Sequence, residues 1–422
     1  MKTLRTCLLL LLALCLLAAC QSTPETTSQP PESSASRQES SAETSEDASS
    51  EEATSEVSSE TSSEESNEPE PPREGAYMSY EIPDNYKDVY ENPFALETYE
   101  EMEITASNNT YTITYRYPDG ASYRTCLVKK RWGMWMLGAM EYTHANGTKV
   151  RMSESSTDYE WVLSCGKVGG NITFRGGNHG DYTYSDWNAN DSTKTNDHFI
   201  DMTFYDAASG EKVEVANGQT VKVNGLFVVL HNNVYEDAYE QENVLINVEK
   251  LYLFNGESVS VQSKLYLTSD VAFGNAYGSE LMTLDLVTGE VTNLGTITQT
   301  IVNDDGTTKV TKTPITGTSN YGNNFDDRNK ASKVTVFGEQ YPAYHMTIEI
   351  HNPEDQFYQS SHHTRLWDMN PSQNKLYFSA FKPGSVITVK KDTEFTYSSS
   401  WTFSYNPDFE LPEVDKELGF KK

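Results

Sequence analysis

The sequence ITFRGGNHGDY, at residues 172–182, places several side chains that could act on a ligand in one short turn. Two adjacent glycines give the backbone the freedom to turn sharply or to let a ligand approach closely. Asn178, His179 and Asp181 follow them directly. If the residues before the glycines form a strand, His179 projects from its end, where it could accept or donate a proton. An ordinary surface turn is the alternative interpretation.

A second histidine stands in a comparable position, because LFVVLHNN at 226–233 is an apolar run that ends in His231 and Asn232. Tyr277, in FGNAYGSE, and Arg365, in HHTRLW, add a phenol and a guanidinium. Cleavage of a uronic-acid polymer by β-elimination needs a base for the C5 proton, an acid at the leaving oxygen and a group that neutralises the carboxylate. These side chains are the types that such a reaction requires.

We therefore assign catalytic roles and ligand-binding roles as a hypothesis. The predicted catalytic residues are His179, His231 and Tyr277, and the predicted substrate-binding residues are Asn178, Asn232, Arg365 and Trp187. Trp187 lies in a polar loop, and its ring could stack on the apolar face of a sugar. The alternatives are a hydrogen-bonded core histidine, a turn tyrosine and an arginine on the polar face of a strand.

The loop at 186–197 partly fits a calcium-binding loop. Asp186, Asn188 and Asn190 occupy the first three ligand positions of such a loop. However, Asp191 replaces the turn glycine, and the closing residue is aspartate where glutamate is usual. A solvated polar loop is therefore favoured over calcium, and no other cofactor is expected.

The N-terminus has the pattern of an export signal. Lys2 and Arg5 precede an almost uninterrupted apolar run at 7–19, which is too short for the roughly 20 residues of a spanning helix. The run ends in LAAC, which resembles the bacterial lipobox, where the cysteine receives a lipid and becomes the first residue. The resemblance implies that 1–19 is a lipoprotein signal peptide and that Cys20 is the lipid anchor.

A low-complexity segment follows Cys20. Residues 21–73 contain 14 acidic and two basic residues, are rich in Ser, Thr and Pro, and carry few apolar side chains. Such a segment cannot bury enough apolar surface to offset the entropy of the chain. We therefore expect 20–73 to be a lipidated, disordered stalk. The protein would then be extracytoplasmic and attached to the bacterial cell membrane through its lipid alone.

The remaining residues, 74–422, carry recurrent period-two patterns such as TYTITYRY at 110–117 and KLYLFNGESVSVQSKLYLTS at 250–269. Alternation of this kind is typical of strands, and Asn255 and Gly256 predict a hairpin turn within the second run. The sequence therefore predicts an all-β fold, a large antiparallel β-sandwich of the jelly-roll or supersandwich type.

Two details of this domain stay open at the level of sequence. Helical periodicity is scarce, with a short stretch near Ala95–Met102 as the best candidate for a helix, and residues 74–155 could form a small subdomain. Cys126 and Cys165 are the cysteines of this domain, and they fit a disulfide as well as two buried thiols.

The net charge of the chain limits the classes of partner that it can bind. The formal net charge is −30, which argues against nucleic acid, because phosphate contacts need an excess of Lys and Arg. It also counts against a polyanionic substrate, unless a local basic patch outweighs the mean charge. The sequence does not determine the oligomeric state.

The stretch from Ile172 to Phe381, through RGGNHGDY, VVLHNNVY, NAYGSE and RLWDMNPSQNKLYFSAF, is similar to β-sandwich carbohydrate-active proteins. Examples are jelly-roll polysaccharide lyases and sandwiches of the galactose-mutarotase kind. The resemblance implies a polysaccharide or oligosaccharide ligand bound across one sheet. The candidate functions are a polysaccharide lyase that cleaves by β-elimination, a non-catalytic glycan-binding lipoprotein, and a structural or adhesive surface protein.

Overall fold

The structure is a computed structural model, and its described residues belong to one compact unit, Glu70–Lys422. It describes residues 82–129, 133–138, 140–151, 162–177, 196–236, 243–274, 280–286, 295–302, 307–314, 331–338, 343–351, 363–367, 374–379, 386–410 and 412–417. Apart from the short 3-10 helix η2 (Tyr86–Asp88), the regular elements of these residues are strands. The predicted all-β fold with large antiparallel sheets is confirmed. No helix in this described part is long and apolar enough to cross a membrane.

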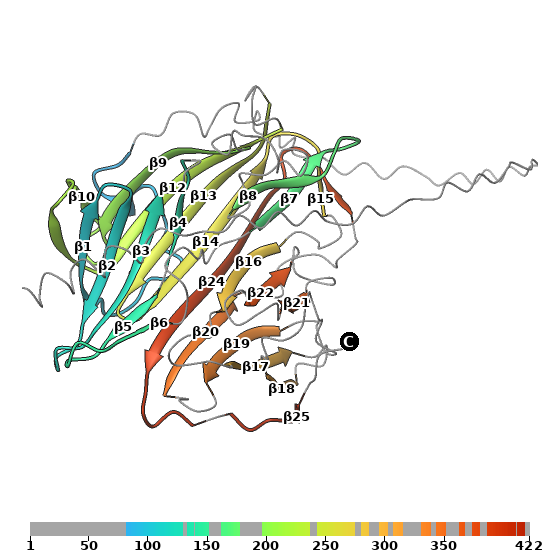
Figure 1. The fold of residues 1–422 in the computed structure, drawn as a ribbon. Coiled ribbons are helices and arrows are strands. Elements are labelled where there is room, and N and C mark those ends of the chain that lie inside the picture. The colour runs from blue at the N-terminus through green and yellow to red at the C-terminus, as the bar shows by residue number, and fades with distance from the viewer. Residues whose placement is uncertain are drawn as a thin grey trace, which may run out of the picture. The chain divides into compact units, whose positions relative to one another are not determined.

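The largest sheet has 11 strands and runs through the whole unit (Figure 1). Neighbouring strands in this sheet run antiparallel, except that β18 and β25 run parallel to each other. In spatial order the strands are β10 (Lys212–Val213), β9 (Asp197–Asp206), β12 (Leu226–Tyr235), β13 (Val244–Asn255), β14 (Ser258–Leu267), β24 (Glu394–Tyr405), β20 (Tyr344–His351), β19 (Ala331–Gly338), β17 (Gly295–Val302), β18 (Thr308–Pro314) and β25 (Lys416–Glu417).

Two further sheets have seven strands each. The second sheet contains β11 (Thr220–Asn224), β1 (Glu101–Ser107), β2 (Thr110–Arg116), β3 (Ser122–Lys129), β5 (Glu141–Thr143) and β6 (Lys149–Arg151), and β4 (Trp135–Leu137) also pairs with β3. The third sheet contains β21 (His363–Trp367), β22 (Asn374–Ser379), β16 (Glu280–Leu286), β7 (Val162–Lys167), β15 (Val271–Phe273) and β23 (Ile387–Val389), and β8 (Thr173–Gly177) also pairs with β7.

Strand alternation decides which side chains of the large sheet are buried. In β14, Val259, Val261, Leu265 and Leu267 are buried, and the intervening side chains point to the opposite face, because successive residues of a strand alternate. The buried face shares one hydrophobic core with apolar side chains of the second and third sheets. We call the opposite face of the large sheet its outer face.

A hairpin joins β13 and β14 as the sequence predicts, but its two-residue turn lies one residue later than expected. Asn255 pairs with Ser258 at the end of the ladder, so Gly256 and Glu257 form a two-residue turn. Gly256 has a φ of 61°, a left-handed conformation that glycine adopts without steric cost.

The helix expected near Ala95–Met102 is wrong. β1 begins at Glu101 and pairs with β11 through Glu101 and Asn224. The residues before it have no regular structure from Val89 to Glu100. The pairing with β11, which lies far away in the sequence, outweighs the weak local helical pattern.

Residues 82–100 form a strap on the outer face, drawn in blue beside β10 in Figure 1. Tyr86 is 2% exposed and lies in a small second core with side chains of β9, β12 and β13, among them Phe227 and Leu253. The phenol of Tyr86 donates to the carbonyl of Ala207 at 2.9 Å. At the other end of the strap, the amide of Glu100 donates to the side chain of Asn255 at 2.7 Å. The strap is therefore fixed at both ends.

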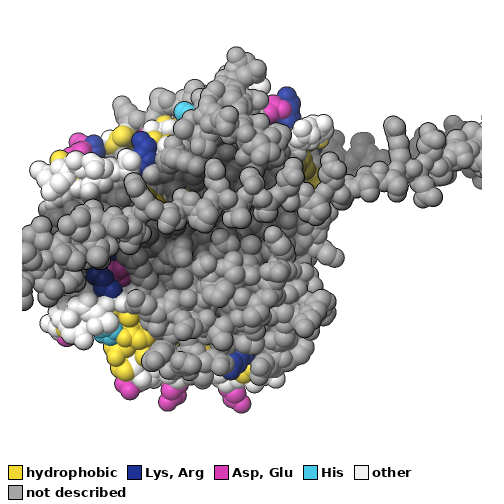
Figure 2. Space-filling model, in the orientation of Figure 1, with side chains coloured by type: hydrophobic (Ala, Val, Ile, Leu, Met, Phe, Trp, Pro, Cys, Tyr) yellow, Lys and Arg dark blue, Asp and Glu magenta, His cyan; other side chains and the backbone are white. Residues whose placement is uncertain are grey.

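An aromatic cluster joins the second sheet to the large sheet. The rings of Tyr142 and Tyr405 lie 5.4 Å apart between centroids, and His144 packs against Tyr405 at 4.9 Å. The Nε2 of His144 also contacts the phenol of Tyr344. Figure 2 shows hydrophobic side chains and a histidine gathered near the end of β24.

Candidate functional site

Most of the residues singled out from the sequence lie outside the described residues. These are Cys20, Asn178, His179, Asp186, Trp187, Asn188, Asn190 and Tyr277. Arg365 is described only as part of β21, where it pairs with Tyr377 in the third sheet. His231 and Asn232 are described in full, and both belong to the large sheet.

His231 lies within β12 and not at its end, because the strand continues to Tyr235. The imidazole is on the outer face, is 2% exposed, and is bonded on both sides. Its Nδ1 lies 2.8 Å from the Oδ1 of Asp201, and its Nε2 lies 3.0 Å from the Oε2 of Glu249. Carboxylates accept hydrogen bonds, so both ring nitrogens donate, which only the doubly protonated ring can do.

Electrostatics agree with this assignment. Burial disfavours the charged imidazole, but the hydrogen bonds and negative charges of Asp201 and Glu249 outweigh burial and raise the pKa of His231 from its ordinary value of 6.5. A general base needs a ring nitrogen within hydrogen-bond reach of the proton that it takes. Both nitrogens of His231 are occupied by carboxylates in this structure. Its catalytic role stays a prediction.

Asn232 points to the opposite face from His231, because neighbouring residues of a strand alternate. It is fully buried and donates through its amide nitrogen to Asp197. Its Oδ1 has no hydrogen-bond partner among the described residues. The structure therefore does not bring His231 and Asn232 to one surface, as their adjacent positions in the sequence suggested.

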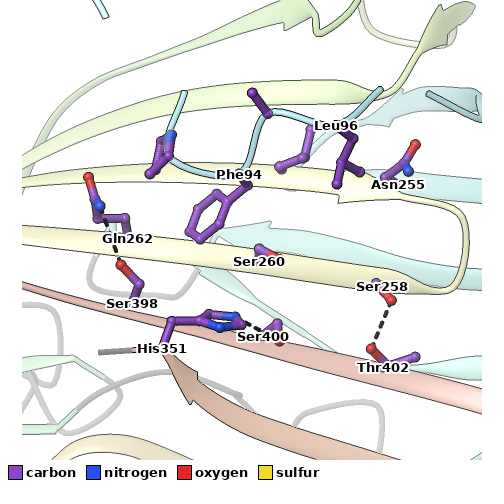
Figure 3. A pocket seen from close by; sticks show the side chains of 13 residues that line it. Phe94, Leu96, Asn255, Ser258, Ser260, Gln262, His351, Ser398, Ser400 and Thr402 are labelled. Atoms are coloured by element: carbon purple, nitrogen blue, oxygen red, sulfur yellow. Dashed lines mark hydrogen bonds between the residues drawn. The ribbon is translucent and has the colours of Figure 1, made fainter. Parts of the chain in front are cut away.

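A pocket of about 560 Å³ lies on the outer face, beside the strap. Side chains of β13, β14, β24 and β20 form its floor, and strap residues form one wall (Figure 3). The lining residues are Pro93, Phe94, Ala95, Leu96, Leu253, Asn255, Ser258, Ser260, Gln262, His351, Ser398, Ser400 and Thr402. Register explains this composition, because Ser258, Ser260 and Gln262 stand directly opposite Thr402, Ser400 and Ser398.

Hydrogen bonds between neighbouring strands order the floor of the pocket (Figure 3). The hydroxyls of Ser258 and Thr402 lie 2.8 Å apart. The amide of Gln262 donates to the Oγ of Ser398 at 3.3 Å. Each hydroxyl can donate one hydrogen bond and accept two, so these pairs retain capacity for a ligand.

His351 stands at the edge of the floor, at the end of β20. Its Nε2 lies 3.0 Å from the Oγ of Ser400, and its ring centroid lies 6.2 Å from that of Phe94 on the strap. Burial lowers the pKa of His351 from its ordinary value of 6.5, against the opposing effect of the charge on Glu349. The ring is therefore neutral at pH 7, in contrast to His231.

A serine that is hydrogen-bonded to a histidine, as Ser400 is to His351, can also be part of a nucleophilic catalytic site. Ser400, however, lies in the middle of β24, where the ladder joins it to Ser260 on one side and Glu349 on the other. Backbone amides that are engaged in a ladder cannot stabilise an oxyanion. Among the described residues, no carboxylate hydrogen-bonds the Nδ1 of His351. The pair is better suited to binding than to nucleophilic attack.

Among the described residues, no Asp, Glu, Lys or Arg lines the pocket. Charged side chains on the same face are paired beyond its rim: Lys264 lies 3.2 Å from Glu394, and Lys333 lies 3.6 Å from Glu349. The pocket therefore offers hydroxyl, amide and imidazole groups together with one aromatic ring. A neutral ligand with many hydroxyl groups fits this chemistry.

Sequence reasoning missed every residue of this pocket. One signal was present, because positions 398, 400, 402 and 404 carry hydroxyl residues, whereas 397, 401 and 403 carry large apolar ones, with Ser399 as the exception. That pattern indicates a strand with a polar, uncharged outer face. Nothing in the sequence of the strap indicates that Phe94 lies over this face.

Comparisons with known proteins do not identify the chain. No family model matches it, and no curated protein matches it. The galactosidase domain of the α-galactosidase–sucrose kinase AgaSK is similar in structure, with a TM-score of 0.42 and 9% identity over 72% of this chain and 42% of that chain. The GH36 α-galactosidase AgaB from Geobacillus stearothermophilus has a TM-score of 0.42 and 8% identity over 72% and 41%. The Slr1438 protein from Synechocystis sp. PCC 6803 has a TM-score of 0.38 and 10% identity over 75% and 100%.

This chain thus spans about two fifths of the length of the two galactosidases. At these identities and TM-scores, the likeness assigns neither a function nor a set of site residues to this chain.

Proposed function

We propose that the chain is a glycan-binding lipoprotein whose β-domain holds an uncharged carbohydrate in the pocket beside the strap. The observation that carries the proposal is the lining of that pocket. Hydroxyl and amide groups form its floor, Phe94 stands in its wall, and none of the described lining residues is Asp, Glu, Lys or Arg.

Sugar chemistry matches this lining in two ways. A pyranose presents hydroxyl groups around its edge, and the hydroxyls of Ser258, Ser400 and Thr402 can donate to them or accept from them. It also presents an apolar face of C–H groups, on which an aromatic ring such as Phe94 can stack. Few polar groups at fixed positions, combined with apolar walls, are typical of small-molecule sites.

Binding without cleavage is favoured over the lyase hypothesis. A β-elimination needs a base with an open nitrogen or oxygen and a group that neutralises the uronate carboxylate, which a cationic side chain does most directly. The described residues of the pocket lining include no Lys or Arg, and the two nitrogens of His231 contact Asp201 and Glu249. The lyase hypothesis now rests on His179 and Tyr277, which lie outside the described residues.

The anchor is the second part of the proposal. Cys20 would carry the lipid, and residues 21–73 would hold the domain away from the membrane on its outer side. Replacing Cys20 with Ala should release the protein from the membrane fraction or leave it unprocessed. Unchanged lipidation and membrane retention of Cys20→Ala would contradict the anchor.

A glycan panel tests the binding function. We expect the full chain, purified in detergent, to bind at least one neutral glycan. Phe94→Ala should weaken that binding about tenfold, which corresponds to roughly 1.4 kcal/mol. Val89→Ala is the matched control, because Val89 lies on the same strap, is 61% exposed and does not line the pocket.

Two outcomes would contradict the proposal. One is a panel in which no neutral glycan binds. The other is equal affinity of the wild type and Phe94→Ala. Incubation with uronic-acid polymers, monitored for unsaturated products in the ultraviolet, tests the lyase hypothesis in the same preparation.

A further inference from the structure

A row of hydroxyl groups begins in the pocket and crosses the outer face from strand to strand. Ser258 of β14 stands opposite Thr402 of β24, Thr402 opposite Thr347 of β20, and Thr347 opposite Thr335 of β19. All four residues are half-buried and so keep part of their surface in solvent. We call them the hydroxyl row. The next residue in line, Thr298 of β17, is 5% exposed and ends the accessible part.

Cross-strand hydrogen bonds fix the orientation of the row. Ser258 and Thr402 are 2.8 Å apart through their hydroxyls, and Thr335 and Thr347 are 2.9 Å apart. In each pair one hydroxyl donates and the other accepts. Because a hydroxyl has one donor and two acceptor sites, each pair keeps one O–H and three lone pairs. Such pairs can satisfy ligand hydroxyls in either role.

The row is bordered on one side by a closed ion pair and on the other by aromatic rings. Lys333 and Glu349 lie beside Thr335 and Thr347 along the same strands and are 3.6 Å from each other. On the other side, the ring of Phe409 stacks on His345 at 3.9 Å between centroids. An aromatic ring therefore lies beside each end of the row: Phe94 at the pocket end and Phe409 at the far end.

Spacing points to the form of the ligand. Neighbouring strands of a sheet lie about 4.7–4.9 Å apart, which is about the length of one pyranose residue in an extended chain. One hydroxyl side chain per strand therefore presents one polar group per sugar residue to a chain that crosses the strands. Figure 1 shows β14, β24, β20 and β19 side by side in this order.

We propose that the ligand is an extended, uncharged polysaccharide whose chain starts in the pocket and crosses β24, β20 and β19 along the hydroxyl row. This inference rests on the proposed glycan-binding function and adds the length and direction of the ligand. The pocket holds the first two sugar residues, over Ser258 and Thr402 and beside Phe94, and Thr347 and Thr335 hydrogen-bond the two residues that follow.

Sheet stability is the competing explanation for the row, because directly opposed threonines stabilise antiparallel pairs. The chain offers a matched control in the second sheet. Thr105 and Thr220 also face each other across two strands, with their hydroxyls 2.8 Å apart, but they lie away from the pocket and the row. Valine keeps the branched shape of threonine, and replacing both partners of a hydrogen bond by apolar groups of the same shape is nearly neutral for stability.

The experiment compares ligand lengths in the full chain in detergent, by titration calorimetry. The probes are β-1,4-linked oligosaccharides of glucose, mannose and galactose, each with two and with six residues. For the type of oligosaccharide that binds, we expect the six-residue ligand to bind at least tenfold more tightly than the two-residue ligand. The double variant Thr335→Val/Thr347→Val should reduce the affinity for six residues to within about twofold of that for two residues. It should leave the affinity for two residues and the melting temperature unchanged.

Thr105→Val/Thr220→Val should change none of these values. Equal affinity for both lengths, or an unchanged affinity of Thr335→Val/Thr347→Val for six residues, overturns the inference and leaves the pocket as the whole site. If no oligosaccharide of either length binds, the inference falls together with the proposed function. If Thr105→Val/Thr220→Val also reduces the affinity for the six-residue ligand, the hydroxyl row acts through the stability of the fold. That result also overturns the inference.

Discussion

Replacement of His231 with Leu should destabilise the protein in a way that depends on pH. The imidazolium is 2% exposed and donates to Asp201 and Glu249, whose side chains are 24% and 13% exposed. Both carboxylates are less than one third exposed, so water screens them only in part. Hydrogen bonds to charged groups contribute about 1.5–3 kcal/mol each, and removing one partner of a buried ion pair costs about 3–5 kcal/mol. We expect His231→Leu to lower the free energy of unfolding by about 3 kcal/mol at pH 6.

The sign of the pH dependence follows from the raised pKa of His231. In the unfolded chain the ring titrates near its ordinary value of 6.5. Below that pH the ring is charged in both states, and its stabilising effect is fully present. As the pH rises through the higher pKa of the folded state, that effect is lost, at up to about 1.4 kcal/mol per pH unit. The difference between wild type and His231→Leu should therefore shrink from pH 6 to pH 9.

Urea unfolding of the full chain, followed by tryptophan fluorescence at several pH values, measures this difference. His198→Leu is the matched control, because His198 is an exposed histidine of the same sheet, and we expect its replacement to have little effect at any pH. The double variant Asp201→Asn/Glu249→Gln should abolish the dependence while keeping the imidazole. A difference between wild type and His231→Leu that is the same at pH 6 and pH 9 would refute the assignment of a buried imidazolium.

Three other variants test the strap and the pocket. Tyr86→Phe loses the buried hydrogen bond to the carbonyl of Ala207, which is 2.9 Å long, and should lower the free energy of unfolding by about 1 kcal/mol in urea titrations. Gly210→Ala should cost at least about 1 kcal/mol in the same assay, because φ is +86° and a Cβ would lie 2.2 Å from the Oδ1 of Asn85. The pKa of His351 is lowered, so the wild type should lose stability as the pH falls below about 6.5, and His351→Gln should show a smaller loss between pH 7 and pH 5.

The sequence predicts the strands of this fold well where a pattern is local. The alternation in 110–117 corresponds to β2 (Thr110–Arg116), and the run at 250–269 corresponds to β13 and β14 with Gly256 in their turn. The helix expected near Ala95–Met102 fails because β1 obtains its pairing from β11, a strand more than one hundred residues away. Local periodicity carries no information about such a partner.

The same limit explains why the site was missed. Ser260 and Ser400 meet in the pocket because β14 and β24 are neighbours, although about 140 residues of sequence separate them. His351 belongs to the pattern YHMTIEIHN, which predicts β20, but the pattern does not say that β24 lies beside it. His231 attracted attention as a polar residue after an apolar run, and the structure shows that its partners are carboxylates on the two adjacent strands.

The strap is what turns a polar sheet face into a pocket. Two aromatic residues in the middle of the strap pack against histidines of the sheet. The ring centroids of Tyr90 and His231 lie 6.5 Å apart. Those of Phe94 and His351 lie 6.2 Å apart. The buried side chain of Tyr86 fixes the strap on one side of Phe94. The hydrogen bond between Glu100 and Asn255 fixes it on the other. A wall that is held at both ends loses little conformational freedom when a ligand stacks on it, and less of the binding free energy is then offset by ordering of the protein. The contacts that fold the strap onto the sheet therefore also preorganise the site.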